Sequence, residues 1–161
     1  MLVERVDVGI VDPRGREPNG RIRYFDVTEA CLFCKIVAGE LPCERVDEDE
    51  HTVAFMDISP WTRGHALVIP RNHARDLYEI DAEGLRHTMV SVQRLALRMR
   101  ERLGCEGVNV FSSCEAAAGQ TVFHLHIHVL PRFAGDAIRL PGKPREPERD
   151  ELAVVAAELR G

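Results

Sequence analysis

The segment Gln120–Arg132 alternates between polar and apolar residues, which predicts a β-strand. Alternate side chains of an extended strand share a face, so His124, His126 and His128 should line one side. The opposite side is apolar and should pack in a core: Phe123, Leu125, Ile127 and Val129. A row of three imidazoles backed by core residues is unusual for a purely structural strand. It indicates a chemical site.

Between Asp81 and Leu103 the apolar residues recur three or four positions apart, which predicts a long amphipathic helix. Asp81 is suited to the N-cap, and Gly104 should end the helix. We expect this helix to cover the apolar face of a sheet. Its predicted apolar positions are Leu85, Met89, Val92, Leu95, Ala96, Met99 and Leu103.

Short apolar runs on both sides of this helix predict further strands. Residues 51–57 form a strand candidate that ends on Asp57, and residues 64–70 form the next, so a hairpin is expected. Residues 108–111 precede a loop of small residues at 112–119, and the acidic segment 44–50 is predicted to be turn. Two strands, a long helix and two strands make an α+β fold with an antiparallel sheet.

The ends of the chain carry weaker patterns. Residues 31–39 predict a short helix that stops at a glycine, and residues 148–160 predict a short terminal helix. Residues 1–30 are compatible with a hairpin or with a flexible segment. We therefore expect an N-terminal extension over residues 1–30, one domain over residues 31–140, and a tail over residues 141–161.

Composition fits a single globular domain whose core needs no disulfide bonds. The 161 residues are 45% hydrophobic and 29% charged, and their formal net charge of -5 argues against a general nucleic-acid surface. No segment has the apolar character of a signal peptide or a membrane span, so we expect a cytoplasmic protein with no membrane partner. Five cysteines, an odd number, favour a reducing compartment.

Cys31 and Cys34 form a Cys-x-x-Cys pair, which is typical of half a metal site or of a redox pair. A metal ion would need two more ligands, and His73 and His124 are candidates by residue type. One ion cannot hold all three histidines of the row. In an extended strand the outer two lie roughly 13 Å apart, whereas a zinc–nitrogen bond is about 2 Å long. At least one imidazole must therefore act elsewhere. Zinc binding, redox chemistry and free thiols remain open for the cysteines.

Together with Cys31–Ile36, Asp57–Ser59 and Gly64–Pro70, the segment Gln120–Arg132 resembles the histidine triad (HIT) family, in its zinc-containing bacterial Hint-like branch. The resemblance implies a five-stranded antiparallel sheet with one long and one short helix, usually in a homodimer that binds a purine nucleotide, an AMP or GMP moiety. It also implies a nucleotide hydrolase. Such an enzyme cleaves the α-phosphate bond of nucleoside phosphoramidates, adenylylated compounds or dinucleoside polyphosphates.

The resemblance further implies roles for individual residues. His126 would be the nucleophile that forms a nucleotidyl-histidine intermediate, His128 would assist the leaving group, and His65 would support His126. Nucleotide binding is implied for eight residues: Phe33, Ile36, Phe55, Asp57, Ile58, Ser113, Gln120 and Thr121. A structural zinc ion is implied at Cys31, Cys34, His73 and His124.

The loop before Gln120 departs from the family pattern, because Ser113-Cys114-Glu115 stands where the family usually has Asn-x-Gly. Serine offers fewer hydrogen bonds than asparagine, and Glu115 adds negative charge beside a phosphate site. This loop favours a zinc-stabilised nucleotide-binding protein with little turnover as an alternative. A nucleotidyltransferase is a second alternative, although that branch typically has glutamine at the position of His128. A catalytic zinc ion held by the histidine row is a third.

Overall fold

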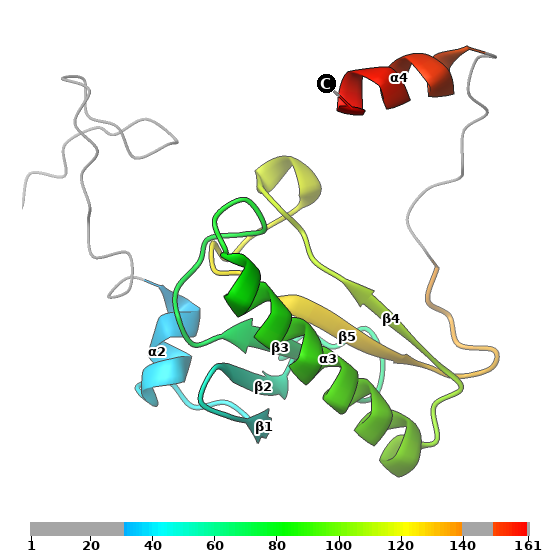
Figure 1. Ribbon diagram of the computed structural model, residues 1–161. Coiled ribbons are helices and arrows are strands. Elements are labelled where there is room, and N and C mark those ends of the chain that lie inside the picture. The colour runs from blue at the N-terminus through cyan, green and yellow to red at the C-terminus, as the bar shows by residue number, and fades with distance from the viewer. Residues whose placement is uncertain (1–30, 140–149, 161) are drawn as a thin grey trace, which may run out of the picture.

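A five-stranded antiparallel sheet forms the centre of the computed structural model, which describes residues 31–139 and 150–160 (Figure 1). Its spatial order is β1-β2-β3-β5-β4, and every neighbouring pair is antiparallel. The strands are β1 (Arg45–Glu48), β2 (Thr52–Met56), β3 (Ala66–Pro70), β4 (Gly107–Phe111) and β5 (Ile127–Arg132). The predicted α+β fold is therefore confirmed. The hairpin considered for residues 1–30 lies outside the described residues.

The long helix α3 (Ala82–Leu103) covers one face of the sheet (Figure 1). The Asp81 carboxylate accepts a hydrogen bond from the Gly84 N–H at 2.7 Å, and Gly104 ends the helix in the left-handed conformation. Met89, predicted to be buried, is 44% exposed. Ser91 is buried on the face of α3 that packs on the sheet, and its hydroxyl accepts a hydrogen bond from the Thr52 hydroxyl of β2. These small polar side chains allow α3 to lie close to β2.

The short helix α2 (Leu32–Ala38) packs on the opposite face of β2 and β3. Its Phe33 and Ile36 are buried, and Gly39 ends the helix with φ 78°. Because α3 and α2 cover different faces, consecutive residues of β2 and β3 are buried on both sides. The α2 face of this core contains Val53, Phe55, Leu67 and Ile69.

Two strands differ from the prediction. β1 lies in the acidic segment expected to be turn, where Asp47 pairs with Arg94 and Arg98 of α3 and the backbone pairs with β2. β5 begins at Ile127, so the strand expected over residues 120–132 is half as long. Before Ile127 the pairing with β3 stops, and the Leu125 N–H bonds instead to the Ala74 carbonyl at 2.7 Å.

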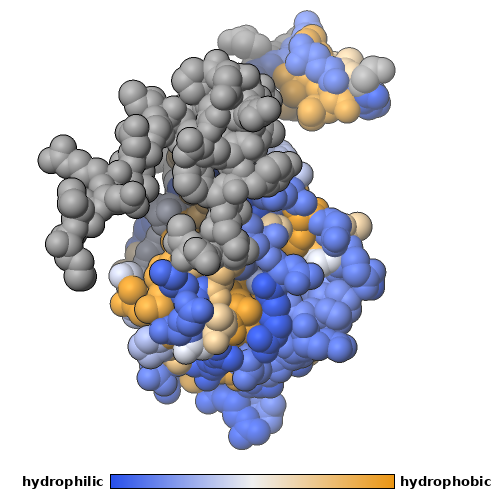
Figure 2. Space-filling model, turned by 90° about the vertical axis from the view of Figure 1, so that its left-hand side faces the viewer, coloured by the Kyte–Doolittle hydropathy of each residue, from blue (hydrophilic) through white to orange (hydrophobic). Residues whose placement is uncertain are grey.

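The remaining elements are the 3-10 turn η1 (Ala116–Ala118) and the terminal helix α4 (Glu151–Arg160), which matches the short helix predicted for the tail. No residue of α4 is buried, and its hydrophobic surface is visible in Figure 2. Its exposed apolar residues are Leu152, Val154, Val155 and Leu159. Among the described residues, no helix is both long and apolar enough to cross a membrane.

Candidate active site and metal centre

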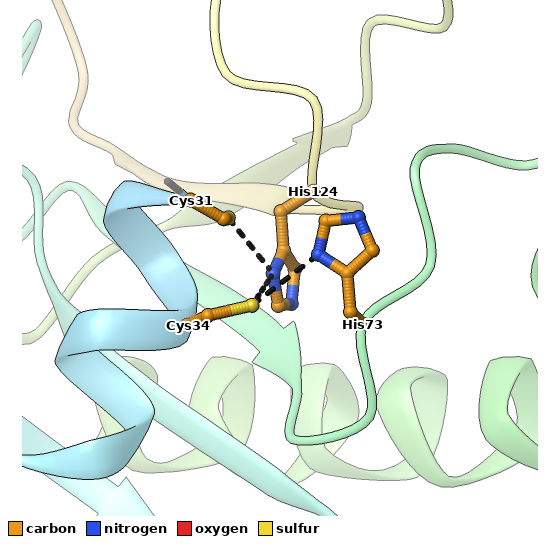
Figure 3. Close-up of side chains that lie close together, drawn as sticks. All are labelled: Cys31, Cys34, His73 and His124. Carbon is orange, nitrogen blue, oxygen red and sulfur yellow. Dashed lines mark hydrogen bonds between the residues drawn. The ribbon is translucent and has the colours of Figure 1, made fainter. Parts of the chain in front are cut away.

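Four predicted metal ligands converge beside α2 (Figure 3). Cys31 precedes the helix and Cys34 lies in its first turn, so both thiols point to the same side. His73 comes from the loop after β3, and His124 comes from the bend before β5. The four donor atoms, two Sγ and two Nδ1, all lie within 4.8 Å of one another.

The distances in this cluster fit a tetrahedral zinc ion. Cys34 Sγ lies 3.3 Å from His73 Nδ1 and 3.5 Å from His124 Nδ1, and Cys31 Sγ lies 3.5 Å from His124 Nδ1. Ligands at the usual zinc–sulfur and zinc–nitrogen bond lengths and at the tetrahedral angle are about 3.5 Å apart. The donor set and its spacing therefore match a closed Cys2His2 site.

His124 is oriented for such a role by its second ring nitrogen. Its Nε2 lies 2.9 Å from the Pro70 carbonyl, to which it donates as Nε2–H, so the Nδ1 lone pair faces the sulfur atoms. Burial lowers the pKa of His124 to about 4, which keeps the ring neutral at pH 7. A neutral imidazole held by a backbone carbonyl is the form that binds a metal ion.

A cleft of about 250 Å³ opens next to this cluster, between α2 and the end of β2. Phe33 and Phe55 form one wall as an edge-to-face pair with ring centroids 5.5 Å apart, and the exposed Ile58 lies at the mouth. Eight of the predicted site residues line the cleft: Phe33, Ile36, Phe55, Asp57, Ile58, Thr121, His126 and His128. The fold thus brings together residues that are more than 90 positions apart.

His126 is held by its backbone neighbour. Its Nδ1 lies 2.7 Å from the His124 carbonyl oxygen, and a carbonyl only accepts, so Nδ1 carries the proton. The Nε2 atom of the neutral ring therefore has a free lone pair. His126 lines the cleft and is only 6% exposed, so its ring has little contact with bulk water.

His65 and His128 form a relay of hydrogen bonds. The Trp61 backbone N–H donates to His65 Nδ1 at 3.2 Å, so the neutral His65 ring carries its proton on Nε2. That Nε2–H lies 2.9 Å from His128 Nδ1, which therefore accepts and leaves the His128 proton on its own Nε2. Asp57 Oδ2 lies 3.5 Å from His65 Nε2 and 3.8 Å from His128 Nδ1.

Both rings of this relay are kept neutral by their surroundings. Burial lowers the pKa of His128 to about 4, and the nearby His126 and His65 add to the effect, while Asp57 opposes it. Burial also lowers the pKa of His65, again against the attraction of Asp57. Asp57, His65 and His128 could also hold a metal ion, since their donor atoms lie within 4.8 Å of one another.

The two remaining predicted binding residues, Ser113 and Gln120, are not among the described residues that line the cleft. The buried Gln120 amide group is used within its own loop and on the loop that follows β3. Its Nε2 donates to the carbonyls of Arg75 and Val122, and its Oε1 accepts from the Glu115 N–H at 2.8 Å. In this structure Gln120 therefore shapes the loop before the histidine row.

The family model for the HIT domain matches residues 38–135, which is more than half of the chain. The chain belongs to the HIT family. Adenosine 5'-monophosphoramidase of Schizosaccharomyces pombe is 35% identical over 133 residues, which cover 81% of this chain and 96% of that protein.

Solved structures agree with this membership. A protein of Streptococcus mutans UA159 superposes with a TM-score of 0.79 at 34% identity, covering 99% of this chain and 98% of that chain. A zinc-bound histidine triad family protein of Mycobacterium smegmatis has a TM-score of 0.68 at 40% identity, covering 83% and 97%. The zinc-bound relative fits the Hint-like branch.

Three residues of this HIT domain were missed by sequence reasoning. Phe111, at the end of β4, stacks on the His128 ring with centroids 4.5 Å apart, and Trp61 stacks on Phe111 at 5.6 Å. Arg75 pairs with Glu115 at 2.7 Å and lies 4.4 Å above the ring of Phe123, which was expected in the core but is 40% exposed. The single tryptophan between two predicted strands was the one available signal.

Proposed function

We propose that this HIT protein is a nucleotide hydrolase in which His126 attacks the α-phosphorus of a nucleoside 5'-phosphate derivative. The supporting observation is the hydrogen bond from His126 Nδ1–H to the His124 carbonyl, which leaves the Nε2 lone pair available in a cleft of nucleotide-binding character. The phosphoramidase activity named for the S. pombe relative supports the same reaction class.

The cleft suits a nucleoside on the side of α2. The Phe33 and Phe55 rings and the Ile36 side chain form an apolar slot for a flat base, and such apolar walls discriminate poorly between bases. The purine is the base that the family resemblance implies. Asp57 Oδ1 accepts from the Ser59 N–H at 2.7 Å, which orients the carboxylate. Its two oxygens provide acceptor positions for both ribose hydroxyls.

The reaction has two displacements at phosphorus. In the first, a bond forms between His126 Nε2 and the α-phosphorus, and the bond from phosphorus to the leaving nitrogen or oxygen breaks. The leaving group takes a proton from His128, which enters this step as imidazolium after proton uptake beside the anionic substrate and leaves it neutral; Nε2 donates the proton, because Nδ1 faces His65. In the second, water gives its proton to His128 and its oxygen to phosphorus, which releases the nucleoside monophosphate and restores His126.

The Cys2His2 cluster is proposed to hold zinc as a structural ion. A closed tetrahedral site has no position for water or substrate, so the ion would supply stability rather than chemistry. Cys31 and Cys34 would tie α2 to the bend at His124, and His126 follows two residues later. The metal would thus hold the base slot and the nucleophile in one arrangement.

The wider setting stays a prediction. We expect a homodimer in the cytoplasm, where the five cysteines, none of which forms a disulfide bond in this structure, would remain reduced. Because of Ser113 and Glu115, the second candidate function is that of a nucleotide-binding protein with little turnover. Glu115 is nevertheless paired with Arg75, and this pairing reduces the negative charge that it offers to a substrate.

The deciding experiment compares His126→Ala with the wild-type protein on adenosine 5'-phosphoramidate, AMP-lysine and diadenosine polyphosphates. We expect the variant to lose at least about 1000-fold in kcat, because it lacks the nucleophile. His87→Ala, which changes a histidine of α3 that stacks on His51 and does not line the cleft, is the matched control and should keep full activity. Undiminished hydrolysis by His126→Ala would refute the mechanism. Tight AMP binding with no turnover by the wild type would favour the second candidate.

A further inference from the structure

Four aromatic contacts form a continuous row of rings through the site. Phe33 lies 5.3 Å from His126, and His126 lies 5.1 Å from His128. Phe111 is nearly parallel to His128, with an interplanar angle of 10°, and Trp61 stacks on Phe111 at 27°. The row therefore runs from the apolar slot, past the two histidines, to Trp61.

The two ends of this row face different parts of a substrate. If the nucleoside occupies the slot at Phe33, as in the proposed function, the leaving group must lie away from it. An in-line displacement puts the leaving group opposite His126, and proton donation requires it to be near His128. Phe111 and Trp61 continue the row beyond His128, so they border the leaving-group side.

Trp61 has the character of a contact surface. Trp61 is 61% exposed although it belongs to the bulkiest residue type and carries a large flat ring, and its backbone N–H donates to His65 Nδ1. A single exposed apolar residue is ordinary on a protein surface. Here, however, the indole rests on a ring that itself stacks on His128, so its position is linked to the reacting groups.

We propose that Trp61, supported by Phe111, is a stacking platform that selects leaving groups carrying a flat aromatic ring. This inference rests on the proposed function for the direction of the substrate. An indole stacks on flat rings better than on puckered ones, and stacking on an exposed aromatic residue contributes enough to change a rate constant about tenfold. Trp61 would then determine specificity without touching the phosphorus.

The test uses two adenosine 5'-phosphoramidates with similar leaving amines, 2-phenylethylamine and 2-cyclohexylethylamine, which differ mainly in the flatness of the ring. We expect wild-type kcat/KM to favour the phenyl compound about tenfold, and Trp61→Ala to remove this preference by slowing the phenyl compound alone. Trp61→Phe should retain most of it. Tyr78→Ala, which removes another exposed aromatic ring, should change neither rate constant.

A second readout separates the platform from the proposed reaction. Trp61 is the one tryptophan among the 161 residues, so intrinsic tryptophan fluorescence reports on this position directly. In the full-length His126→Ala variant, the phenyl compound should change the emission, whereas AMP and the cyclohexyl compound should not. If the phenyl compound changes the emission but the wild type does not hydrolyse it, the proposed function is overturned, whereas the role of Trp61 as a stacking platform is supported.

A third substrate identifies the source of the ring. Diadenosine tetraphosphate offers a second nucleobase instead of an aryl amine, and a loss with Trp61→Ala for that compound alone would assign the platform to the base. Equal wild-type rates for the phenyl and cyclohexyl compounds, together with no effect of Trp61→Ala on any aromatic substrate and no emission change, would overturn the inference. The hydrolase proposal would then still stand.

Discussion

Glu115 occupies a backbone conformation that side chains rarely adopt. Its φ of 71° and ψ of 161° fall in a region that is populated almost only by glycine. The conformation is held from two sides, because the Glu115 N–H donates to Gln120 Oε1 and the carboxylate pairs with Arg75. This is the position at which the HIT family usually has glycine, so the strain is a property of this chain.

Glu115→Gly should therefore stabilise the protein relative to Glu115→Ala. Both variants lose the Arg75 pair, which is half exposed and worth at most about 1 kcal/mol. Only glycine relieves the backbone strain, which should raise the free energy of unfolding of the glycine variant by about 1–3 kcal/mol relative to the alanine variant. Glycine also gives the unfolded chain more conformational entropy, which offsets up to about 1 kcal/mol of this difference. Urea unfolding measures the difference. Equal stabilities would show that the backbone is unstrained.

His128 should make stability depend on pH. The pKa of its buried ring is about 4 in the folded protein and near 6.5 in an unfolded chain. Below pH 6.5 the unfolded chain binds a proton that the folded one does not, so stability present above pH 6.5 is lost as the pH falls toward 4. The lowered pKa of His65 acts in the same direction.

The matched variant is His128→Asn, whose amide oxygen can still accept from His65 but does not titrate. From pH 7 to pH 4.5 we expect the wild type to lose about 2 kcal/mol more stability than the variant. Metal release at low pH is common to both proteins and cancels in the comparison. Parallel pH profiles from thermal unfolding would contradict the assignment of a lowered pKa to His128.

At the scale of elements, α2 connects the proposed metal site to the base slot. Cys34 lies in its first turn and Cys31 directly precedes it, while Phe33 and Ile36 pack on β2 and β3. A helix of this length is not stable by itself, so its position depends on packing and on the cluster at its start. Loss of the metal should therefore disturb the cleft wall before it disturbs the sheet.

Removal of zinc by a chelator, or Cys34→Ala, should lower the melting temperature by several degrees and raise KM for nucleotide substrates more than it lowers kcat. Cys43→Ala removes a thiol outside the cluster and should have little effect on either constant. Metal content by atomic absorption checks the loading, with one zinc ion per chain expected. Full loss of kcat at an unchanged melting temperature would instead indicate a catalytic metal.

At the scale of the whole molecule, α3 presents apolar residues on its outer side. Val90 and Leu97 lie two helical turns apart and are 53% and 63% exposed. Burial of such a stripe against its symmetry mate would stabilise a dimer with an isologous interface. Light scattering should then give twice the chain mass of 18.1 kDa for the wild type.

Leu97→Glu should shift this mass toward 18.1 kDa, because it puts a charge in the buried stripe. Leu152→Glu on α4 serves as the control, since it adds the same charge to another exposed apolar helix. If Leu152→Glu lowers the mass to that of a monomer and Leu97→Glu does not, the dimer interface involves α4 and not α3. A monomeric wild type would contradict the expected homodimer.

The sequence alone determined the features that depend on neighbouring residues. The length of α3 and its caps at Asp81 and Gly104 follow from helical periodicity and local hydrogen bonding. The β2–β3 hairpin and the place of His128 in β5 follow from short apolar runs and the period of an extended chain, whereas His124 and His126, predicted in the same strand, precede it. The segments that carry the HIT motifs were also recognisable, and the family membership they implied is confirmed.

Tertiary structure decided what depends on residues far apart in the chain. The pairing of Asp47 with α3 made a strand from a segment that looks like turn, and the bond from Leu125 to Ala74 made β5 begin after His126. The single tryptophan drew attention to position 61, but its stack on Phe111 could not be read from the sequence, because Trp61 lies in the loop between β2 and β3 and Phe111 ends β4, 50 positions later. Long-range contacts arise only when the sheet assembles, since their energy depends on distance in space and not on distance in sequence.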